Sequence, residues 1–227
     1  MGGYTEPGGR ILAPATMAGI RLTQRQWRMY LAVWLVAVAI LIGTLVGLLL
    51  PRLFVNHPAP TLSGGLVMPA SSVLAPDFAL LDQRGAMISL AALRGRVVAI
   101  TFLDTKCLDL CPLQASLLGR VQTDVGSRVP FTVVVVSVRP DADTPSTIAT
   151  FAGAHGLSGN FYWLSGPKAQ LPAVWNAYGV GVQVANGDLA HSSVIYLIDR
   201  RGFERVGFAD VPQSDAVVND VRILAGT

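Results

Sequence analysis

The chain has 227 residues, of which 52% are hydrophobic and 14% are charged, and its formal net charge at pH 7 is +3. This length is enough for one large or two small domains. The charge is unevenly placed, because residues 1–28 carry four arginines against one glutamate, whereas residues 74–227 carry slightly more acidic than basic side chains. The positive charge is therefore no sign of a nucleic-acid surface, and we predict no nucleic-acid partner.

An uncharged, apolar segment runs from Met29 to Leu50. A helix needs about 20 apolar residues to span the hydrocarbon core of a bilayer, so this segment is predicted to be a transmembrane helix. Arg28 and Arg52 bracket it with charges that stay in water. A cleaved signal peptide has a shorter apolar run of roughly 7–15 residues. No cysteine precedes Cys107, which excludes a lipoprotein cleavage site, and we predict an uncleaved anchor.

The segments that flank the anchor predict its orientation. Residues 1–28 lack apolar periodicity and are expected to form a disordered tail, whose arginines favour the cytoplasmic side. The large domain is then extracytoplasmic, and the short tail favours a bacterial cell membrane. Residues 51–73 are rich in Pro, Gly and Ser, a composition that blocks helix and sheet alike, and they are predicted to be a tether. Gly43 and Gly47 have the spacing of a helix-dimer face, which makes a homodimer a further hypothesis.

Residues 74–227 alternate between strand and helix patterns, and they are predicted to form one domain. The expected elements are a hairpin with its turn at Gly85, buried strands at 97–103 and 131–138, helices at 112–125, 145–155, 166–177 and 212–225, and a hairpin of strands 194–199 and 203–208. This order is that of the thioredoxin fold. We therefore predict an α/β fold in which a thioredoxin-like domain follows one transmembrane helix.

Two cysteines, Cys107 and Cys111, lie between the first buried strand and the helix that follows it. Sites in open α/β sheets form at the carboxyl ends of strands. The spacing places the two sulfurs within reach of one ion or of each other, and both Lys106 and the helix N-terminus are expected to favour the thiolate. A metal site, a redox couple and a structural disulfide all fit, although a disulfide across so short a loop would stabilise little.

Three motifs around these cysteines resemble the Sco/SenC family of copper-binding assembly proteins. They are Cys107-Leu-Asp-Leu-Cys111-Pro112, Ser137-Val-Arg-Pro-Asp-Ala-Asp-Thr-Pro145 and His191-Ser-Ser-Val-Ile-Tyr-Leu-Ile-Asp199, and the resemblance runs from about Pro76 to Gly202. The chain departs from the family pattern at three positions, which we expect to affect affinity and partner choice. They are Leu108 in place of the usual Pro, Arg139 in place of Asp, and Ala190 where Asp is common.

The resemblance implies that Cys107, Cys111 and His191 bind one copper ion. It also implies a client, subunit II of cytochrome c oxidase, whose dinuclear copper site the family helps to assemble. The donor chemistry agrees, because two thiolates and an imidazole suit Cu(I) or Cu(II), and three ligands are one short of structural zinc. We predict a delivery protein and not a turnover enzyme. His57 and His155 are not expected to take part, and Asp109 is expected to be a solvated loop carboxylate.

The alternative is an extracytoplasmic thiol–disulfide oxidoreductase, in which Cys107 attacks a substrate disulfide and Cys111 resolves it. Ordinary thioredoxin-type enzymes have two residues between the cysteines and a proline, usually cis, before the strand that faces the site. This chain has three intervening residues, and His191-Ser192 stands in the place of the proline. The two functions can also coexist, because both use the same thiolates.

Overall fold

The computed structural model describes residues 23–53, 61–167, 169–185 and 188–226. The chain divides into two compact units, Met1–Pro58 and Ala59–Thr227. Most of the predicted tail, residues 1–22, lies outside the described residues.

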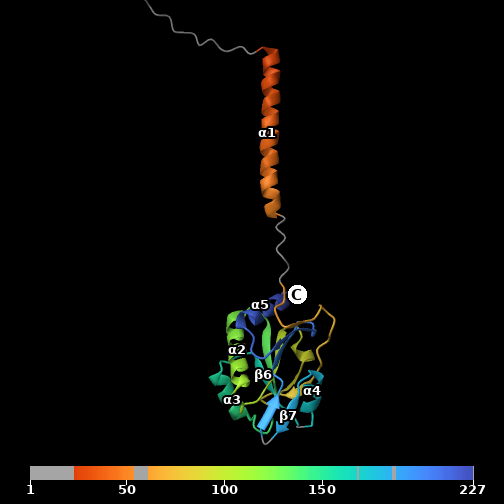
Figure 1. The fold of residues 1–227 in the computed structure, drawn as a ribbon, viewed down its shortest axis with the longest axis vertical. Helices are drawn as coiled ribbons and strands as arrows, with labels where there is room; N and C mark the ends of the chain where they lie inside the picture. Colours follow the sequence, from red (N-terminus) through yellow and green to blue (C-terminus); the bar gives the residue numbers. More distant parts are fainter. Residues whose placement is uncertain (1–22, 54–60, 168, 186–187, 227) are drawn as a thin grey trace, which may run out of the picture. The chain divides into compact units, whose positions relative to one another are not determined.

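The first unit contains one long helix, α1, which spans Gln24–Leu53 (Figure 1). It is longer than the predicted 29–50 helix at both ends, and it continues two residues past Pro51. Within the described residues, the Gln24–Leu48 part is the one helix that is long and apolar enough to cross a membrane, as judged by length and composition. Its large apolar side chains are exposed along the described part, as expected for a helix that meets lipid or another apolar surface.

The second unit is built on a six-stranded sheet in the order β1-β10-β9-β4-β5-β6. The central strands β4 and β5 are parallel and buried along their whole length, which matches their continuous apolar sequences. Strand β9 pairs antiparallel with β4 and β10 pairs antiparallel with β9, whereas β6 extends the parallel part. The strands span Leu66–Val67 (β1), Val97–Leu103 (β4), Phe131–Ser137 (β5), Phe161–Leu164 (β6), Val194–Ile198 (β9) and Glu204–Ala209 (β10).

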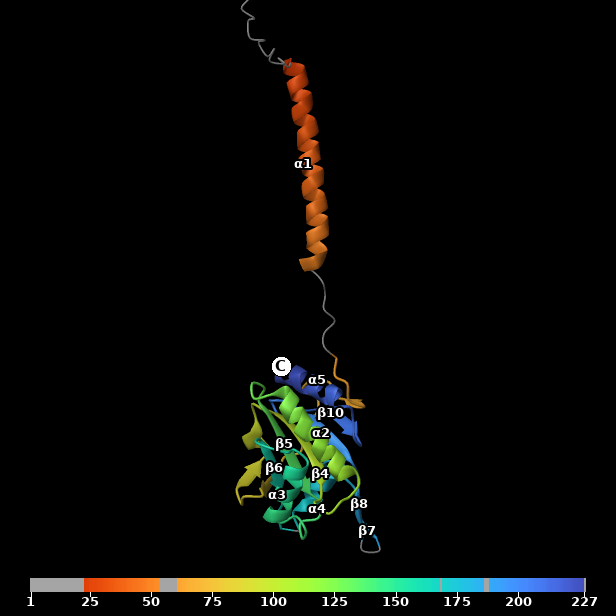
Figure 2. The ribbon, with the colours of Figure 1, turned by 90° about the vertical axis from the view of Figure 1, so that its left-hand side faces the viewer.

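Helices and short hairpins cover the two faces of this sheet. The remaining elements are the hairpins Ala79–Leu81 (β2) with Met87–Ser89 (β3) and Val182–Ala185 (β7) with Asp188–His191 (β8), a 3-10 turn at Ala91–Leu93, and the helices Leu110–Val125 (α2), Pro145–Ala154 (α3), Leu171–Ala177 (α4) and Ser214–Ala225 (α5). Helices α2 and α5 pack against each other (Figure 2). With α3 they bury one face of the sheet, and α4 and the β2–β3 hairpin lie over the other.

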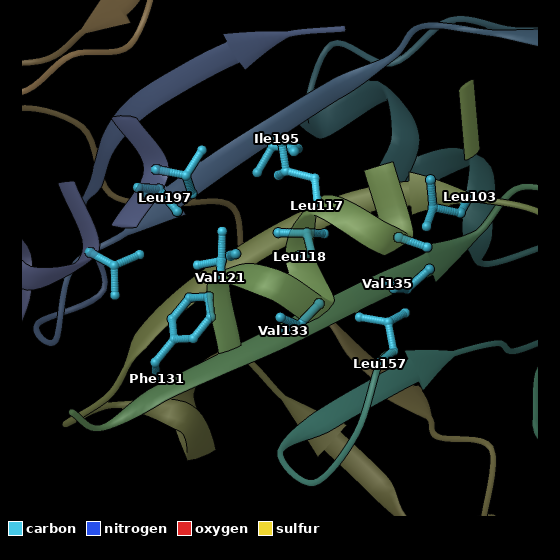
Figure 3. Packing of buried hydrophobic residues seen from close by; sticks show 14 of the residues in the cluster. Leu103, Leu117, Leu118, Val121, Phe131, Val133, Val135, Leu157, Ile195 and Leu197 are labelled. Atoms are coloured by element: carbon cyan, nitrogen blue, oxygen red, sulfur yellow. The ribbon is translucent and has the colours of Figure 1, made fainter. Parts of the chain in front are cut away.

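The first of these two cores holds the helix that carries Cys111. Leu117, Leu118 and Val121 of α2 meet Val133 and Val135 of β5 in it (Figure 3). All five side chains are at most 1% exposed. Because interiors of this kind are close-packed and hardly compressible, the start of α2 has a fixed place relative to the sheet.

Most of the predicted elements are confirmed to within a few residues. Gly85 has φ of 81° at the turn of the β2–β3 hairpin, and the side chain of Thr144 accepts the backbone N–H of Thr147 to cap α3, with Pro145 at its first position. The thioredoxin-like α/β fold is confirmed. Strand β6 and the β7–β8 hairpin were not predicted.

The predicted tether over residues 51–73 needs correction, because its second half belongs to the folded domain. Leu66 and Val67 form β1, which pairs antiparallel with β10. The backbone N–H of Ser63 donates to both carboxylate oxygens of Asp220 on α5, each at 2.9 Å. Pro and Gly in the surrounding sequence do not prevent two residues from pairing with a free strand edge. The domain therefore begins before residue 74.

Candidate metal centre

The loop that carries Cys107 is shaped by Asp104, the first residue after β4. One oxygen of its carboxylate accepts the backbone N–H groups of Lys106, at 2.6 Å, and of Cys107, at 2.7 Å. The other oxygen lies 3.6 Å from Nε of Arg139, which follows β5. An aspartate that accepts backbone N–H groups shortly after its own position is a common way to fold a tight turn. Asp104 is 1% exposed, so these contacts hold Cys107 at the carboxyl edge of the sheet.

Cys111 lies in the first turn of α2 and is buried, with 1% of its surface exposed. Burial is the main cause that raises the pKa of this thiol, and a hydrogen bond with the thiol of Cys107 raises it further. At Cys111, burial therefore opposes the thiolate that Lys106 and the helix N-terminus are expected to favour. A soft metal that binds this sulfur must displace its proton.

His191 ends strand β8 and faces Cys111. Its Nε2 lies 3.5 Å from Sγ of Cys111, and its Nδ1 lies 3.0 Å from the backbone oxygen of Ser192. A carbonyl oxygen only accepts, so Nδ1 carries the proton that joins them, and the tautomer with its single proton on Nδ1 has the Nε2 lone pair on the side of the sulfur. This is the arrangement in which a histidine is ready to bind a metal, since a hydrogen bond to the second nitrogen fixes the ring.

The three predicted site residues line one cavity of about 450 Å³. Lys106, Leu108, Asp109 and Arg139 line it as well, and Leu108, which directly follows Cys107, is 95% exposed. Both cysteines are free thiols. The site is therefore open to solvent and to a partner protein, and its rim combines apolar and cationic side chains.

The three side chains do not form a closed coordination sphere. Within the described part of the chain, no group of three His, Cys, Asp or Glu side chains lies close enough to hold a metal ion without movement. Cys111 and His191 are in direct contact, whereas Cys107 is half-buried and contributes from the loop. Together the three side chains would supply two sulfurs and one nitrogen, a set that fits copper.

Of the residues that were not expected to bind the metal, His155 has a partner elsewhere, whereas Asp109 is exposed and lines the same cavity as the cysteines. His155 caps the end of α3, where its Nδ1 lies 3.1 Å from the Ser116 hydroxyl. His57 lies outside the described residues. Asp109 is exposed, and its side chain makes no capping hydrogen bond at the start of α2. Sequence reasoning missed Asp104, although an aspartate directly after a buried strand is a signal for such a turn.

A thioredoxin-like sheet with two cysteines at the start of α2 and a histidine facing them defines a class of thiol and imidazole metal sites on this fold. The chain belongs to the SCO1/SenC family, whose model matches residues 68–225.

Known relatives and structures agree with this membership. The chain is 28% identical over 177 residues to the SCO2-like protein of Rickettsia felis, an alignment that covers 74% of this chain and 84% of the relative. It resembles the structure of Bradyrhizobium japonicum ScoI with copper bound, with a TM-score of 0.60 and 26% identity over 67% of this chain and 99% of the other. BsSco, a member of the Sco family of cytochrome c oxidase assembly proteins in which a disulfide switch has been identified, shares the fold at 22% identity and a TM-score of 0.60, over 70% and 97% of the two chains.

Proposed function

We propose that this protein binds one copper ion through Cys107, Cys111 and His191 and delivers it to another protein. The observation that supports this most is the 3.5 Å contact between Nε2 of His191 and Sγ of Cys111, with Nδ1 turned to a backbone oxygen. The contact joins residues 80 positions apart in the sequence. A thiol and an imidazole lone pair that face each other at an open cavity suit a soft metal.

Copper is the preferred cargo for reasons of coordination and of family. Two sulfurs and one nitrogen suit Cu(I) or Cu(II), and three protein ligands leave a position from which the ion can pass to a client. The ScoI structure from Bradyrhizobium japonicum contains copper, and this chain belongs to the same family. By this membership we propose that the client is subunit II of cytochrome c oxidase, whose dinuclear copper site would receive the ion or have its thiols prepared.

We further propose that α1 is an uncleaved membrane anchor, with the N-terminus in the cytoplasm and the folded domain on the extracytoplasmic side of a bacterial cell membrane. The length and composition of Gln24–Leu48 support a span, and the arginines of residues 1–28 support the orientation. A side chain placed at Gly43 or Gly47 would meet nothing within 4 Å, so both positions are open for a second α1 in a homodimer.

The second candidate function, thiol–disulfide exchange, is favoured by the two free thiols that line the same open cavity. In it, Cys107 attacks because it is the more exposed cysteine, and Cys111 resolves. The imidazole contact is not needed for that chemistry. No peptide bond of the described residues is cis, so the site lacks the cis-proline of thioredoxin-type enzymes there. Copper delivery accounts for more of the site.

The test compares Cu(I) affinities of full-length variants in detergent, by competition with a chromophoric chelator. His191→Ala removes one of the three donors and is expected to weaken binding by at least about 100-fold, since the loss of even an outer partner costs about 10–100-fold. His155→Ala is the matched control, because this second histidine makes its contacts elsewhere, and it should leave the affinity unchanged. Unchanged affinity in His191→Ala would leave thiol–disulfide exchange as the remaining function.

A further inference from the structure

Gln114 is a buried amide on the helix that carries Cys111, three residues further along. Its side chain is 1% exposed and makes three hydrogen bonds. Nε2 donates to the Ser193 hydroxyl at 2.8 Å and to the backbone oxygen of Asp210 at 2.6 Å, and Oε1 accepts the Thr101 hydroxyl at 3.1 Å. Both N–H groups of the amide are therefore satisfied inside the protein, whereas its oxygen shares the single hydroxyl proton of Thr101 with the backbone oxygen of Val194.

These contacts connect α2 with the segment that holds His191. Ser193 follows His191 by two residues, and its backbone oxygen also accepts the N–H of Asp210 at 3.1 Å. Thr101, in β4, donates to the backbone oxygen of Val194 at 2.8 Å. We call Gln114 and its three partners, Thr101, Ser193 and the Asp210 carbonyl, the Gln114 clamp. It fastens residues 193–194 to the helix of Cys111.

His191 is also held by its own hairpin, in which it pairs with Val182. It is half-buried and ends the short β7–β8 hairpin, which stands outside the main sheet. The next residue, Ser192, exchanges hydrogen bonds with Gly181 through its backbone N–H, at 3.0 Å, and its hydroxyl, at 3.1 Å. Those bonds connect the histidine to the start of β7 and not to Cys111. The distance between imidazole and sulfur therefore depends on how residues 193–194 are held against α2.

We propose that Gln114 is a positioning residue for the copper site, which keeps His191 in register with Cys111 through the Gln114 clamp. This inference rests on the proposed copper function and adds a residue that touches none of the donors. A buried amide is costly to leave unpaired, so the clamp has one favourable geometry and holds the segment in it. The sulfur and the imidazole are then already in contact before the metal binds, so binding loses less conformational entropy of the chain.

The test is a double-mutant cycle on the full-length chain in detergent, with Cu(I) affinity measured by chelator competition. Gln114→Met removes all three hydrogen bonds with little change in side-chain length, and it is combined with His191→Ala. If Gln114 acts through His191, Gln114→Met weakens binding about 10–100-fold in the native background. It then has no further effect in the His191→Ala background. An equal loss in both backgrounds, or no loss in the native one, overturns the proposal.

Two further variants serve as a control and as a milder disruption of the Gln114 clamp. Gln122→Met is the control, since Gln122 lies on the same helix and hydrogen-bonds Asn160 and Ser158 at its far end, and it should leave copper affinity unchanged. Ser193→Ala removes only one bond of the clamp. It should show the same dependence on the His191 background, and it replaces Gln114→Met if that variant does not fold.

A spectroscopic readout separates positioning from general stability. In the Cu(II)-loaded protein, the nitrogen hyperfine coupling from the imidazole should weaken in Gln114→Met and persist in Gln122→Met. If His191→Ala leaves affinity unchanged, the proposed copper function fails and the clamp fails with it. If His191→Ala weakens binding but Gln114→Met and Ser193→Ala do not, the copper function stands and only the clamp is refuted.

Discussion

The conformation of the Cys107 loop depends most on the carboxylate of Asp104, and the variant Asp104→Ala tests this dependence. The substitution removes two hydrogen bonds in which a buried carboxylate accepts backbone N–H groups at 2.6 and 2.7 Å. Hydrogen bonds to charged groups contribute about 1.5–3 kcal/mol each. The freed N–H groups of Lys106, which is exposed, and of Cys107, which is half-buried, are close enough to solvent to regain part of this in water. We therefore expect the lower end, a loss of about 3 kcal/mol in the free energy of unfolding.

The contact of Asp104 with Arg139 is not included in this figure. Nε of Arg139 is buried with no hydrogen-bond partner among the described residues and lies 3.6 Å from a carboxylate that is 1% exposed, so Asp104→Ala also removes the nearest opposite charge from a buried nitrogen, and the figure is a lower bound. For a domain of this size, about 3 kcal/mol corresponds to a fall in Tm of roughly 6–12 °C. Urea unfolding followed by circular dichroism, together with a thermal scan, measures both quantities on the full-length protein.

The control for this prediction lies in the same loop. Asp109→Ala removes an exposed carboxylate that makes no capping hydrogen bond, and it should change the free energy of unfolding by less than about 0.5 kcal/mol. A loss in Asp104→Ala no larger than in Asp109→Ala would refute the role of Asp104. It would mean that the cysteine loop keeps its shape through the helix and the sheet alone.

Two predictions follow from pKa shifts caused by burial. Iodoacetamide at about pH 8 should modify Cys107 and spare Cys111 in the copper-free protein, because burial raises the pKa of Cys111 above its ordinary value. Peptide mass spectrometry measures the modification of each cysteine, and preferential labelling of Cys111 would contradict the prediction. Burial also raises the pKa of Glu204, so folding favours its protonated form, and the stability of the native protein falls as pH rises above the ordinary carboxyl pKa of about 4.3. Glu204→Gln should therefore gain in urea midpoint relative to the native protein between about pH 4 and pH 7, whereas parallel pH curves would show that this carboxyl does not contribute.

The sequence was most informative where one local pattern favoured a single type of secondary structure. The runs at 97–103 and 131–138 are apolar at nearly every position, as is typical of a strand covered on both faces, and they are confirmed as β4 and β5, of which β5 ends one residue earlier, at Ser137. The capping of α3 by Thr144, with Pro145 at its first position, is also readable from the chain because the signal is local. The Cys-x-x-x-Cys pair was placed correctly at the edge of the sheet for the same reason.

The elements that the sequence did not predict depend on distant partners. Strand β1 is two residues long in a Pro- and Gly-rich segment, and it exists because the edge of β10 is available to pair with it. The β7–β8 hairpin, which carries His191, lies outside the main sheet, and sequence reasoning missed it although Asn186-Gly187 between its strands is a known hairpin signal. The raised pKa of Cys111 likewise could not be predicted, since it follows from burial that appears only when α2 packs on the sheet.

One departure from the family pattern now has a structural account. Arg139 stands where the family usually has an aspartate, and here its guanidinium pairs with Asp104, the residue that orders the Cys107 loop. A carboxylate at position 139 would repel Asp104. Leu108 is almost fully exposed beside the cysteines, where it adds an apolar contact point to the open site. Nothing in the structure explains Ala190.

The convergence of Cys107, Cys111 and His191 on one copper ion is tested most directly by X-ray absorption spectroscopy at the copper edge of the Cu(I)-loaded, full-length protein. The account predicts a first shell of two sulfur atoms at about 2.3 Å and one nitrogen atom at about 2.0 Å, if distances are close to those in zinc sites with the same ligands. It also predicts that the nitrogen contribution is lost in His191→Ala. A shell of sulfur alone in the native protein, or a nitrogen contribution that survives in His191→Ala, would contradict it.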